Sequence, residues 1–542
     1  MIVLQLCLLL NAIANVIPSP VRNTLYGKIQ GKITSRYPGP AVEEYLGVPY
    51  AAPPVGKLRF QRPQSPQPWD GNILNATSLP SACPTRYMGY TYFHRPGFKK
   101  SNEDCLYMNI YVPKINSKRR FPVLLFIHGG SNINGMGALF DGDILAAHGE
   151  MIVITFNYRV SILGFYANPS HGVIGNNGLM DQVFAMQWVQ QNIHYFGGDR
   201  HQVTLHGHSA GAGDVGLHLM SDLSKGLFNN VIIHSGSPIS YWMLSSCVRT
   251  MRTQERPKEC KDGFSLLNSI ETKAAEGLLS GDNINEFFNT IKRFDIVKVV
   301  VDGQFLKDSP AKLLSCGRFH TKNALLMMSR DEGVVVYPNM VEKFYTIFRD
   351  IDSFIQDNTN LFPERKDTFE DDIHKKIEEW KQEGIIEFPE DLHLTADVAI
   401  FGPMVKLAEF IRKKTRDVYM LSFEYLTEKL KQPEWIGVQH GWDLFYVFGV
   451  PLIGHPAFPF TPRDAEVSKK TMTIISDFVK SGHLQFNNRR MKRYNSRCRT
   501  YNKLDYINGQ TVVTKEKYFR KPRIEFWNKY LFPYDEFKCP IH

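Results

Sequence analysis

The pentapeptide at residues 207–211, Gly-His-Ser-Ala-Gly, has the pattern of a turn that presents a nucleophilic serine. A strand-like run at residues 203–205 precedes it and a helix-like run at residues 210–223 follows it, as a catalytic strand-to-helix turn requires. Glycine is expected on both sides of Ser209 because larger side chains would collide with the neighbouring strand and helix. The pattern predicts a nucleophile at Ser209, although a glycine-rich turn without catalysis would look the same.

A serine hydroxyl needs a general base, and a tetrahedral oxyanion needs preorganised N–H donors. Donors are expected at Gly130 and Ser131, directly after a strand-like run, and at Ala210, just after the nucleophile. The 17 histidines do not single out a base. Where such a serine turn occurs, the acid and then the histidine follow it on loops after later strands. Glu332 and His440 fit that order, although a lone Glu or His is more often a surface residue.

The elements that would position these residues alternate between strand and helix. Such alternation predicts an α/β fold, a large mostly parallel mixed sheet flanked by helices on both faces. No repeat or low-complexity linker divides the chain, so residues 15–542 are expected to form a single domain. The strand-like runs are residues 123–127, 151–156, 203–205, 231–233, 324–328 and 418–423, and the helix-like runs are residues 181–193 and 210–223.

The first residues have the composition of an export signal. Residues 1–10 are almost wholly apolar, and Ala12-Ile13-Ala14 follows as a small-x-small cleavage pattern, which predicts a signal peptide at residues 1–14. No later stretch is long and apolar enough to span a membrane. The C-terminus matches neither an ER-retention tetrapeptide nor a prenylation box. We therefore expect a secreted, extracellular protein without a transmembrane anchor.

Seven cysteines remain if Cys7 leaves with the signal, and an oxidising compartment would favour disulfides. Cys83 and Cys105 flank one loop and Cys247 and Cys260 flank another, so both pairs could close locally. The remaining three form an odd set, in which Cys498 could pair with Cys539 and leave Cys316 free. Asn75, in Asn-Ala-Thr, is the one acceptable N-glycosylation site and predicts a surface loop.

The formal net charge is +10, and basic residues crowd into residues 489–503. Such a segment could attract an acidic surface partner, such as a heparin-like polymer or an acidic membrane, although most charge runs are solvated surface. No zinc-finger spacing and no RNA-binding aromatic signature accompanies it, which argues against nucleic acid.

Two motifs point toward bound groups but lack the rest of a site. Residues 211–216 match G-x-G-x-x-G, yet they overlap the serine turn, and no acidic residue ends the next strand as a dinucleotide site would need. His206 and His208 could project two imidazoles from a strand, but no third metal ligand is evident. We therefore predict neither a cofactor nor a metal.

From residue 21 to residue 532 the chain resembles the type-B carboxylesterase and cholinesterase family, which has the α/β-hydrolase fold. The resemblance implies a serine esterase with Ser209 as nucleophile, His440 as general base and Glu332 as the residue that orients it. It also implies disulfides Cys83–Cys105 and Cys247–Cys260, and buried structural ion pairs Arg59–Glu103 and Arg159–Asp181. The matching segments are residues 46–51, 53–54, 58–60, 103–109, 157–160, 175–182 and 196–199, the serine turn, residues 331–333 and residues 440–441.

The chain departs from the family pattern near the expected site. His208 stands where the family usually has Glu, and Ser131 replaces the third glycine of the oxyanion segment. Val334 and Val335 follow Glu332 where cholinesterases place aromatic residues, and quaternary ammonium recognition depends on aromatic faces. A carboxylesterase acting on a small-molecule ester is therefore expected rather than a true cholinesterase.

The same family includes neuroligin-like and gliotactin-like adhesion proteins, which keep the fold and bind partner proteins. Those members typically lose a triad residue and carry a transmembrane helix. Ser209, Glu332 and His440 are all present here. The alternative to an esterase is thus a weak or inactive relative that acts in protein–protein binding.

Overall fold

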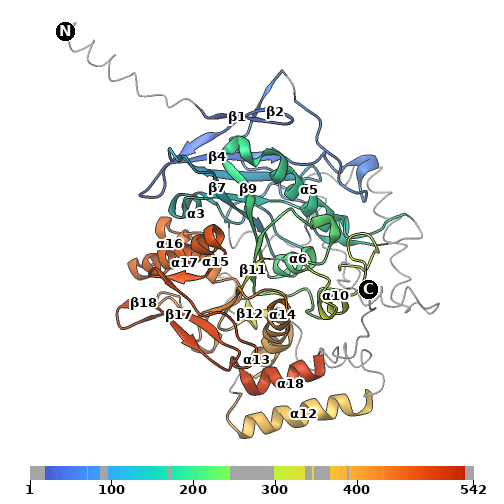
Figure 1. Ribbon diagram of the computed structural model, residues 1–542, viewed down its shortest axis with the longest axis vertical. Coiled ribbons are helices and arrows are strands. Elements are labelled where there is room, and N and C mark those ends of the chain that lie inside the picture. Colours follow the sequence, from blue (N-terminus) through green and yellow to red (C-terminus); the bar gives the residue numbers. More distant parts are fainter. Residues whose placement is uncertain are drawn as a thin grey trace.

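The computed structural model describes residues 19–69, 71–85, 95–167, 172–244, 298–320, 322–335, 345–346, 366–386, 390–430 and 432–531. Within them, eleven strands form one large sheet in the order β18-β17-β14-β11-β10-β9-β7-β8-β6-β4-β3. The strands from β17 to β8 run parallel to their neighbours, and antiparallel strands complete both edges. Helices cover the sheet on both sides (Figure 1). This is the predicted α/β-hydrolase architecture.

The strands are β1 (Val21–Thr24), β2 (Gly27–Gln30), β3 (Lys32–Thr34), β4 (Val42–Pro49), β5 (Ile73–Asn75), β6 (Tyr107–Pro113), β7 (Phe121–Ile127), β8 (Ile152–Phe156), β9 (Gly198–His208), β10 (Asn230–His234), β11 (Asn323–Ser329), β12 (Val334–Val335), β13 (Tyr345–Thr346), β14 (Val418–Phe423), β15 (Gln485–Phe486), β16 (Arg489–Arg490), β17 (Tyr501–Ile507) and β18 (Gln510–Glu516). The α-helices are α3 (Asp143–Gly149), α4 (Ser161–Phe165), α5 (Asn177–Asn192), α6 (Ala210–His218), α10 (Pro310–Ser315), α12 (Lys366–Gln382), α13 (Glu390–Ala396), α14 (Gly402–Arg412), α15 (Asp443–Val447), α16 (Val450–Ile453), α17 (Pro462–Ser481) and α18 (Lys521–Leu531).

Alternate residues of the central strands enter two separate cores, because successive side chains of a strand point to opposite faces. On β7, Val123 and Leu125 pack with residues of α5, α6 and α14. Leu124 and Phe126 pack on the other face with residues of α3, α15 and α17. Burial on both faces explains why these strands read as continuous apolar runs rather than alternating ones.

All the predicted strands and helices occur, but some of their ends differ: β9 begins at Gly198, five residues before the predicted run, and α5 begins at Asn177, four residues before it. The helix-like run at residues 210–223 ends as α6 at His218, five residues early. There Met220 N–H donates to Leu217 O at 2.9 Å, an i→i−3 bond that tightens the last turn, and Asp222–Ser224 forms a separate 3-10 turn. Helix ends commonly tighten in this way, and apolar periodicity does not reveal it.

The sheet register brings the expected site residues to one edge. Ile127 at the end of β7 pairs with Gly207 of β9, and His208 pairs with His234 at the end of β10. His234 in turn pairs with Met327, close to the end of β11. The loops that follow these strands therefore start side by side, as expected for the carboxyl ends of parallel strands.

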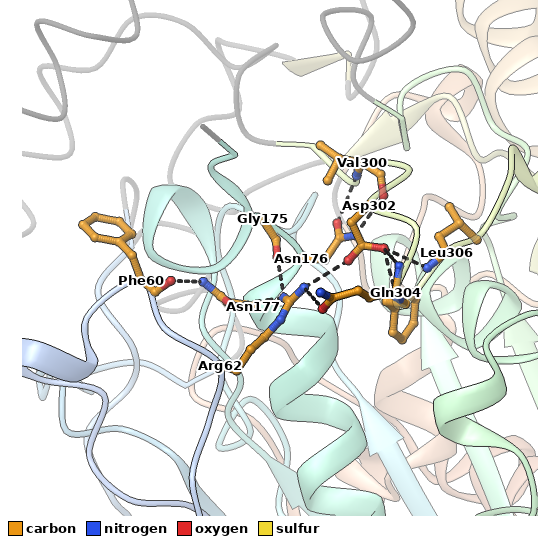
Figure 2. A network of polar contacts seen from close by, with 10 residues as sticks. Phe60, Arg62, Gly175, Asn176, Asn177, Val300, Asp302, Gln304 and Leu306 are labelled. Atoms are coloured by element: carbon orange, nitrogen blue, oxygen red, sulfur yellow. Dashed lines mark hydrogen bonds and ion pairs between the residues drawn. The ribbon is translucent and has the colours of Figure 1, made fainter. Parts of the chain in front are cut away.

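Buried ion pairs tie the loops to this framework. Arg59 makes two bonds of 2.6 Å to Glu103, and Arg159 binds Asp181 at 2.8 and 2.7 Å, with both partners of the second pair fully buried. The resemblance implied these pairs, and the structure contains them. In a further network, Arg62 contacts Gly175 O and Asp302 (Figure 2).

Within residues 298–306, the Asp302 carboxylate makes most of the contacts of that network. Its Oδ2 accepts from Arg62, and its Oδ1 accepts the backbone N–H groups of Gln304, Phe305 and Leu306 at 2.9–3.1 Å (Figure 2). Asn177 extends the network by donating to Phe60 O at 2.8 Å. Three segments that are distant in sequence are thus joined by side chains that satisfy each other's hydrogen bonds.

The cysteines follow the expectations only in part. Cys83 and Cys105 are disulfide-bonded, whereas Cys247, Cys260 and Cys539 lie outside the described residues. Cys316, expected to be free, is disulfide-bonded, and Cys498, expected to have a partner, is the free thiol of the described part. An odd set of three cysteines cannot be paired from sequence spacing alone, because pairing depends on distances in the fold.

Asn75 ends the exposed strand β5, and Thr77 Oγ1 donates to its Oδ1 at 2.7 Å. The predicted signal peptide at residues 1–14 lies outside the described residues. None of the described helices combines the length and apolar character that crossing a membrane would demand.

Candidate active site

Ser209 occupies a sharp turn between β9 and α6, with φ 56° and ψ −122°. Its N–H donates to His234 O at 2.8 Å, which holds the turn against the end of β10. A Cβ added to Gly207 would lie 2.1 Å from Gly211 O, and one added to Gly211 would lie 2.3 Å from Ile127 O. Both flanking glycines are therefore required sterically, and Ser209 is held in a strained conformation of the kind found at functional sites.

Glu332 and His440 form the second part of the site. The fully buried Glu332 accepts hydrogen bonds at Oε1 from Ser235 Oγ (2.6 Å) and from Ser329 N–H (2.7 Å). Its Oε2 lies 2.5 Å from His440 Nδ1. Because an ionised carboxylate only accepts hydrogen bonds, the ring carries its proton on Nδ1 when neutral. Nε2 is then left with a lone pair, as a general base requires.

The loops that carry the acid and the histidine are joined by backbone hydrogen bonds. Asp331 N–H donates to Val438 O at 2.9 Å, and Val438 N–H returns a bond of 2.8 Å to the Asp331 carboxylate. His440 N–H donates to Val334 O at 3.0 Å. The Glu332–His440 contact is therefore part of a rigid connection between two loops rather than an isolated pair.

His208 lies against His440. Its ring centroid is 4.6 Å from that of His440 and 5.0 Å from that of His234. Both Ser209 and His440 are described, and no hydrogen bond joins the serine Oγ to the His440 ring. Such a bond is often long or poorly aligned before substrate binds, so its absence does not disqualify the pair.

The other two histidines of this cluster belong to a buried chain. His206 Nε2 lies 3.2 Å from His234 Nδ1, and His234 Nε2 lies 2.6 Å from Asp443 Oδ2. Burial, with His234 beside it, lowers the pKa of His206 well below its usual range. No group of three or more potential metal ligands occurs among the described residues. Of the two histidines, His208 lies beside His440, whereas His206 belongs to the buried chain with His234 and Asp443.

The expected oxyanion loop packs directly on Ser209. A Cβ added to Gly129 would lie 2.7 Å from His208 O and 2.9 Å from Ser209 Cβ. Gly130 has φ 113°, and its carbonyl accepts the N–H groups of Ile133 and Asn134 at 2.9 and 2.8 Å. Ser131 and Asn132 follow with φ 59° and 58°. The backbone angle at residue 131 does favour glycine, and serine adopts it at a cost of roughly 1–2 kcal/mol.

A fully buried carboxylate, Asp214, contacts this loop from α6. Its Oδ1 accepts from Asn132 Nδ2 at 3.0 Å and its Oδ2 from Gln182 Nε2 at 2.7 Å. Burial raises the pKa of Asp214 to about 7, although the two hydrogen bonds act in the opposite direction. Sequence reasoning missed Asp214, Asn132 and Ser235, because nothing in their spacing marks them as neighbours of Ser209.

Replacing Asp214 with Asn will change how stability depends on pH. In the native protein the folded state keeps the Asp214 proton up to pH of about 7, whereas the unfolded chain loses it near 3.8. The stability that this group contributes to the native protein is therefore lost as the pH rises from about 3.8 to about 7. Asn does not titrate, so the variant does not lose stability in this way. Between pH 4.5 and 6.5 the variant should gain roughly 2 kcal/mol relative to the native protein. Urea unfolding at several pH values measures this, and a constant difference would contradict it.

The basic segment is partly neutralised. Arg493 pairs with Asp417 at 2.7 Å, Arg499 lies 3.4 Å from Glu525, and Lys503 lies 3.8 Å from Glu424. The Arg489–Arg490 strand remains exposed. These ion pairs favour the interpretation of residues 489–503 as solvated surface, and an acidic partner remains a prediction.

Comparison with known proteins agrees with the fold. Residues 18–527 match the profile of the carboxylesterase family. The chain belongs to the carboxylesterase family. Three family members are similar to it over most of its length. Mouse (Mus musculus) neuroligin-2 is 32% identical over 517 residues, covering 85% of this chain and 60% of that protein. Mouse neuroligin-3 is 31% identical over 608 residues, covering 98% and 72%. Acetylcholinesterase from Bungarus fasciatus is 31% identical over 519 residues, covering 90% and 83%.

The chain thus spans only about 60% of the length of the neuroligin-2 proteins it matches. Membership of the carboxylesterase family establishes the α/β-hydrolase fold of this chain. Since the family contains both esterase-named and neuroligin-named proteins, its activity has to be argued from the site.

Proposed function

We propose that this chain is a secreted serine carboxylesterase that hydrolyses a carboxylic ester through an acyl-enzyme. The main support is the 2.5 Å contact between Glu332 Oε2 and His440 Nδ1, beside a strained and nearly buried Ser209. A carboxylate that holds the proton on Nδ1 leaves Nε2 free to accept a proton, as a general base must. The predicted export signal supports the extracellular location.

In the proposed reaction Ser209 Oγ attacks the ester carbonyl while His440 Nε2 takes the serine proton. The carbonyl oxygen becomes an oxyanion, for which the N–H groups of Gly130, Ser131 and Ala210 are the proposed donors. His440 then gives the proton to the departing alcohol, which leaves the acyl group on Ser209. Water then attacks the acyl carbonyl while His440 takes its proton, and His440 returns that proton to Ser209 Oγ as the bond from Oγ to the acyl carbon breaks and the acid leaves. Glu332 stays ionised throughout and stabilises the imidazolium.

Covalent labelling tests this proposal. Purified full-length protein is treated with a fluorophosphonate probe, and Ser209→Ala is the matched control, since it removes only one oxygen atom. We expect labelling and hydrolysis of a short-chain ester by the native protein and neither by the variant. Equal labelling of the variant would place the nucleophile elsewhere, and no labelling of folded native protein would overturn the esterase proposal.

A second candidate is a catalytically weak protein that acts by binding another protein. Two observations favour it: the similarity to the neuroligins and the absence of a hydrogen bond between the described residues Ser209 and His440. The outcomes above separate the two functions. An unlabelled but folded native protein would direct the search to protein partners.

A further inference from the structure

The oxyanion loop holds two consecutive residues, Ser131 and Asn132, in a left-handed conformation without glycine. Serine adopts this conformation at a cost of roughly 1–2 kcal/mol, whereas asparagine tolerates it better, and such a backbone persists only when surrounding contacts determine it. Something must therefore hold residues 131 and 132 in place. If the loop relaxed, the N–H groups of Gly130 and Ser131 would change direction with it.

Asn132 supplies those contacts, because its side-chain amide nitrogen, its side-chain oxygen and its carbonyl oxygen are all engaged. Its Nδ2 donates to Asp214 Oδ1 at 3.0 Å, and its Oδ1 lies 3.2 Å from the Tyr158 hydroxyl. That hydroxyl also donates to His128 O at 2.8 Å, at the start of the loop. The Asn132 carbonyl accepts Ser161 N–H at 2.7 Å. All of these side chains are buried.

Asp214 connects this loop to the nucleophile. It lies on α6, the helix that begins directly after Ser209, and it uses its other oxygen to accept from Gln182 of α5. Gln182 Oε1 contacts His218 Nε2 at 2.7 Å, which in turn contacts Ser224 through Nδ1. A buried carboxylate held by neutral amides is expensive, since burial disfavours the charged form. Its two oxygens each accept a hydrogen bond from an amide, and such a pair of bonds can hold the two donor residues in position.

We propose that Asn132 and Asp214 are positioning residues that fix the oxyanion loop onto the nucleophile helix. This proposal rests on the proposed esterase function, which it deepens. The Asn132–Asp214 bond lets serine occupy a glycine-like position at residue 131 without loosening the loop. The two residues touch neither substrate nor reacting atoms; they act through the direction of the Gly130 and Ser131 N–H groups.

The test combines loss and rescue. Asn132→Gly keeps the left-handed backbone accessible but deletes the amide, and Asp214→Ala deletes the acceptor. The reciprocal swap, Asn132→Asp with Asp214→Asn, can keep every bond. In the swap, the amide nitrogen at position 214 would donate to the carboxylate at position 132, while the amide oxygen at position 214 would accept from Gln182. Ester turnover is measured per active site titrated with the fluorophosphonate, which removes any misfolded fraction from the comparison.

We expect each single variant to lower kcat about 10²-fold with little change in KM, as loss of an oxyanion donor does. Affinity for a trifluoromethyl ketone, which mimics the tetrahedral oxyanion, should fall by a similar factor. The combined Asn132→Gly and Asp214→Ala variant should be no slower than either alone, and the swap should recover to within about tenfold of the native rate. Singles at the native rate, or a swap as slow as the singles, would overturn the proposal.

Hydrogen–deuterium exchange of residues 128–135 gives a readout that needs no catalysis. We expect exchange in the loop to be about tenfold faster in Asn132→Gly and to return toward the native rate in the swap. If exchange were at the native rate in Asn132→Gly and in the swap, the Asn132–Asp214 bond would not be what holds the loop, whether or not the protein is an esterase. Failure of the esterase proposal would instead leave the native protein unlabelled with its loop protection intact.

Discussion

Replacing Glu332 with Gln will lower kcat for ester hydrolysis by about 10⁴-fold while the protein stays folded. The reason lies in which atom the amide must present to His440. Ser329 N–H and the Ser235 hydroxyl both point at Oε1, at 2.7 and 2.6 Å, so the Gln carbonyl oxygen will take that place. The amide NH₂ then faces His440 Nδ1, which must become the acceptor. The ring proton moves to Nε2, where it blocks proton transfer from Ser209.

Ester turnover per folded molecule measures this loss, with the thermal midpoint as a check on folding. Ser235→Ala is the matched control, because it removes one donor to Oε1 and leaves the Ser329 N–H to hold the same rotamer. We expect this control to lose no more than about 10²-fold, in line with one hydrogen bond to a charged group. A Glu332→Gln protein within about tenfold of the native rate would show that Glu332 does not set the tautomer.

The large features of the fold could be predicted from the sequence because buried parallel strands leave a strong signal. The run at residues 123–127 is apolar on both faces, and it became β7 with Leu124 and Leu125 in different cores. The end of α6 could not be predicted, since it depends on a tightened turn at Met220 rather than on periodicity. The predictions for Cys316 and Cys498 were also wrong, because distances across the fold decide which cysteines form disulfides.

At the candidate site, the residues proposed to do the chemistry were easier to find than those proposed to hold them in place. Ser209 was marked by its glycines, and Glu332 and His440 by their order along the chain. Asp214 had no such mark, although it lies one turn beyond the nucleophile, because its role depends on Asn132, which is 82 residues away. Ser131 was recognised as a departure from glycine, but its tolerance depends on contacts that the fold alone creates.

The second large effect concerns the framework. Replacing Arg159 with Met will lower the free energy of unfolding by about 3–5 kcal/mol, because it leaves a buried charge without its partner. Arg159 donates to both oxygens of Asp181, at 2.8 and 2.7 Å, and to Gln61 O at 2.8 Å. In the variant, Asp181 would keep only the bond from the backbone N–H of residue 159. Urea unfolding measures the change.

A surface pair supplies the comparison for this prediction. Lys381 contacts Glu378 at 3.0 Å on α12, where the Glu378 side chain is 63% exposed. Lys381→Met should change the free energy of unfolding by less than about 1 kcal/mol, since water screens exposed pairs. Adding Asp181→Asn to Arg159→Met removes the unpaired charge and should recover part of the loss. If Arg159→Met lowered the free energy of unfolding no more than Lys381→Met does, the buried charge of Asp181 would not be destabilising. The Arg159–Asp181 pair would then not be part of the structural framework.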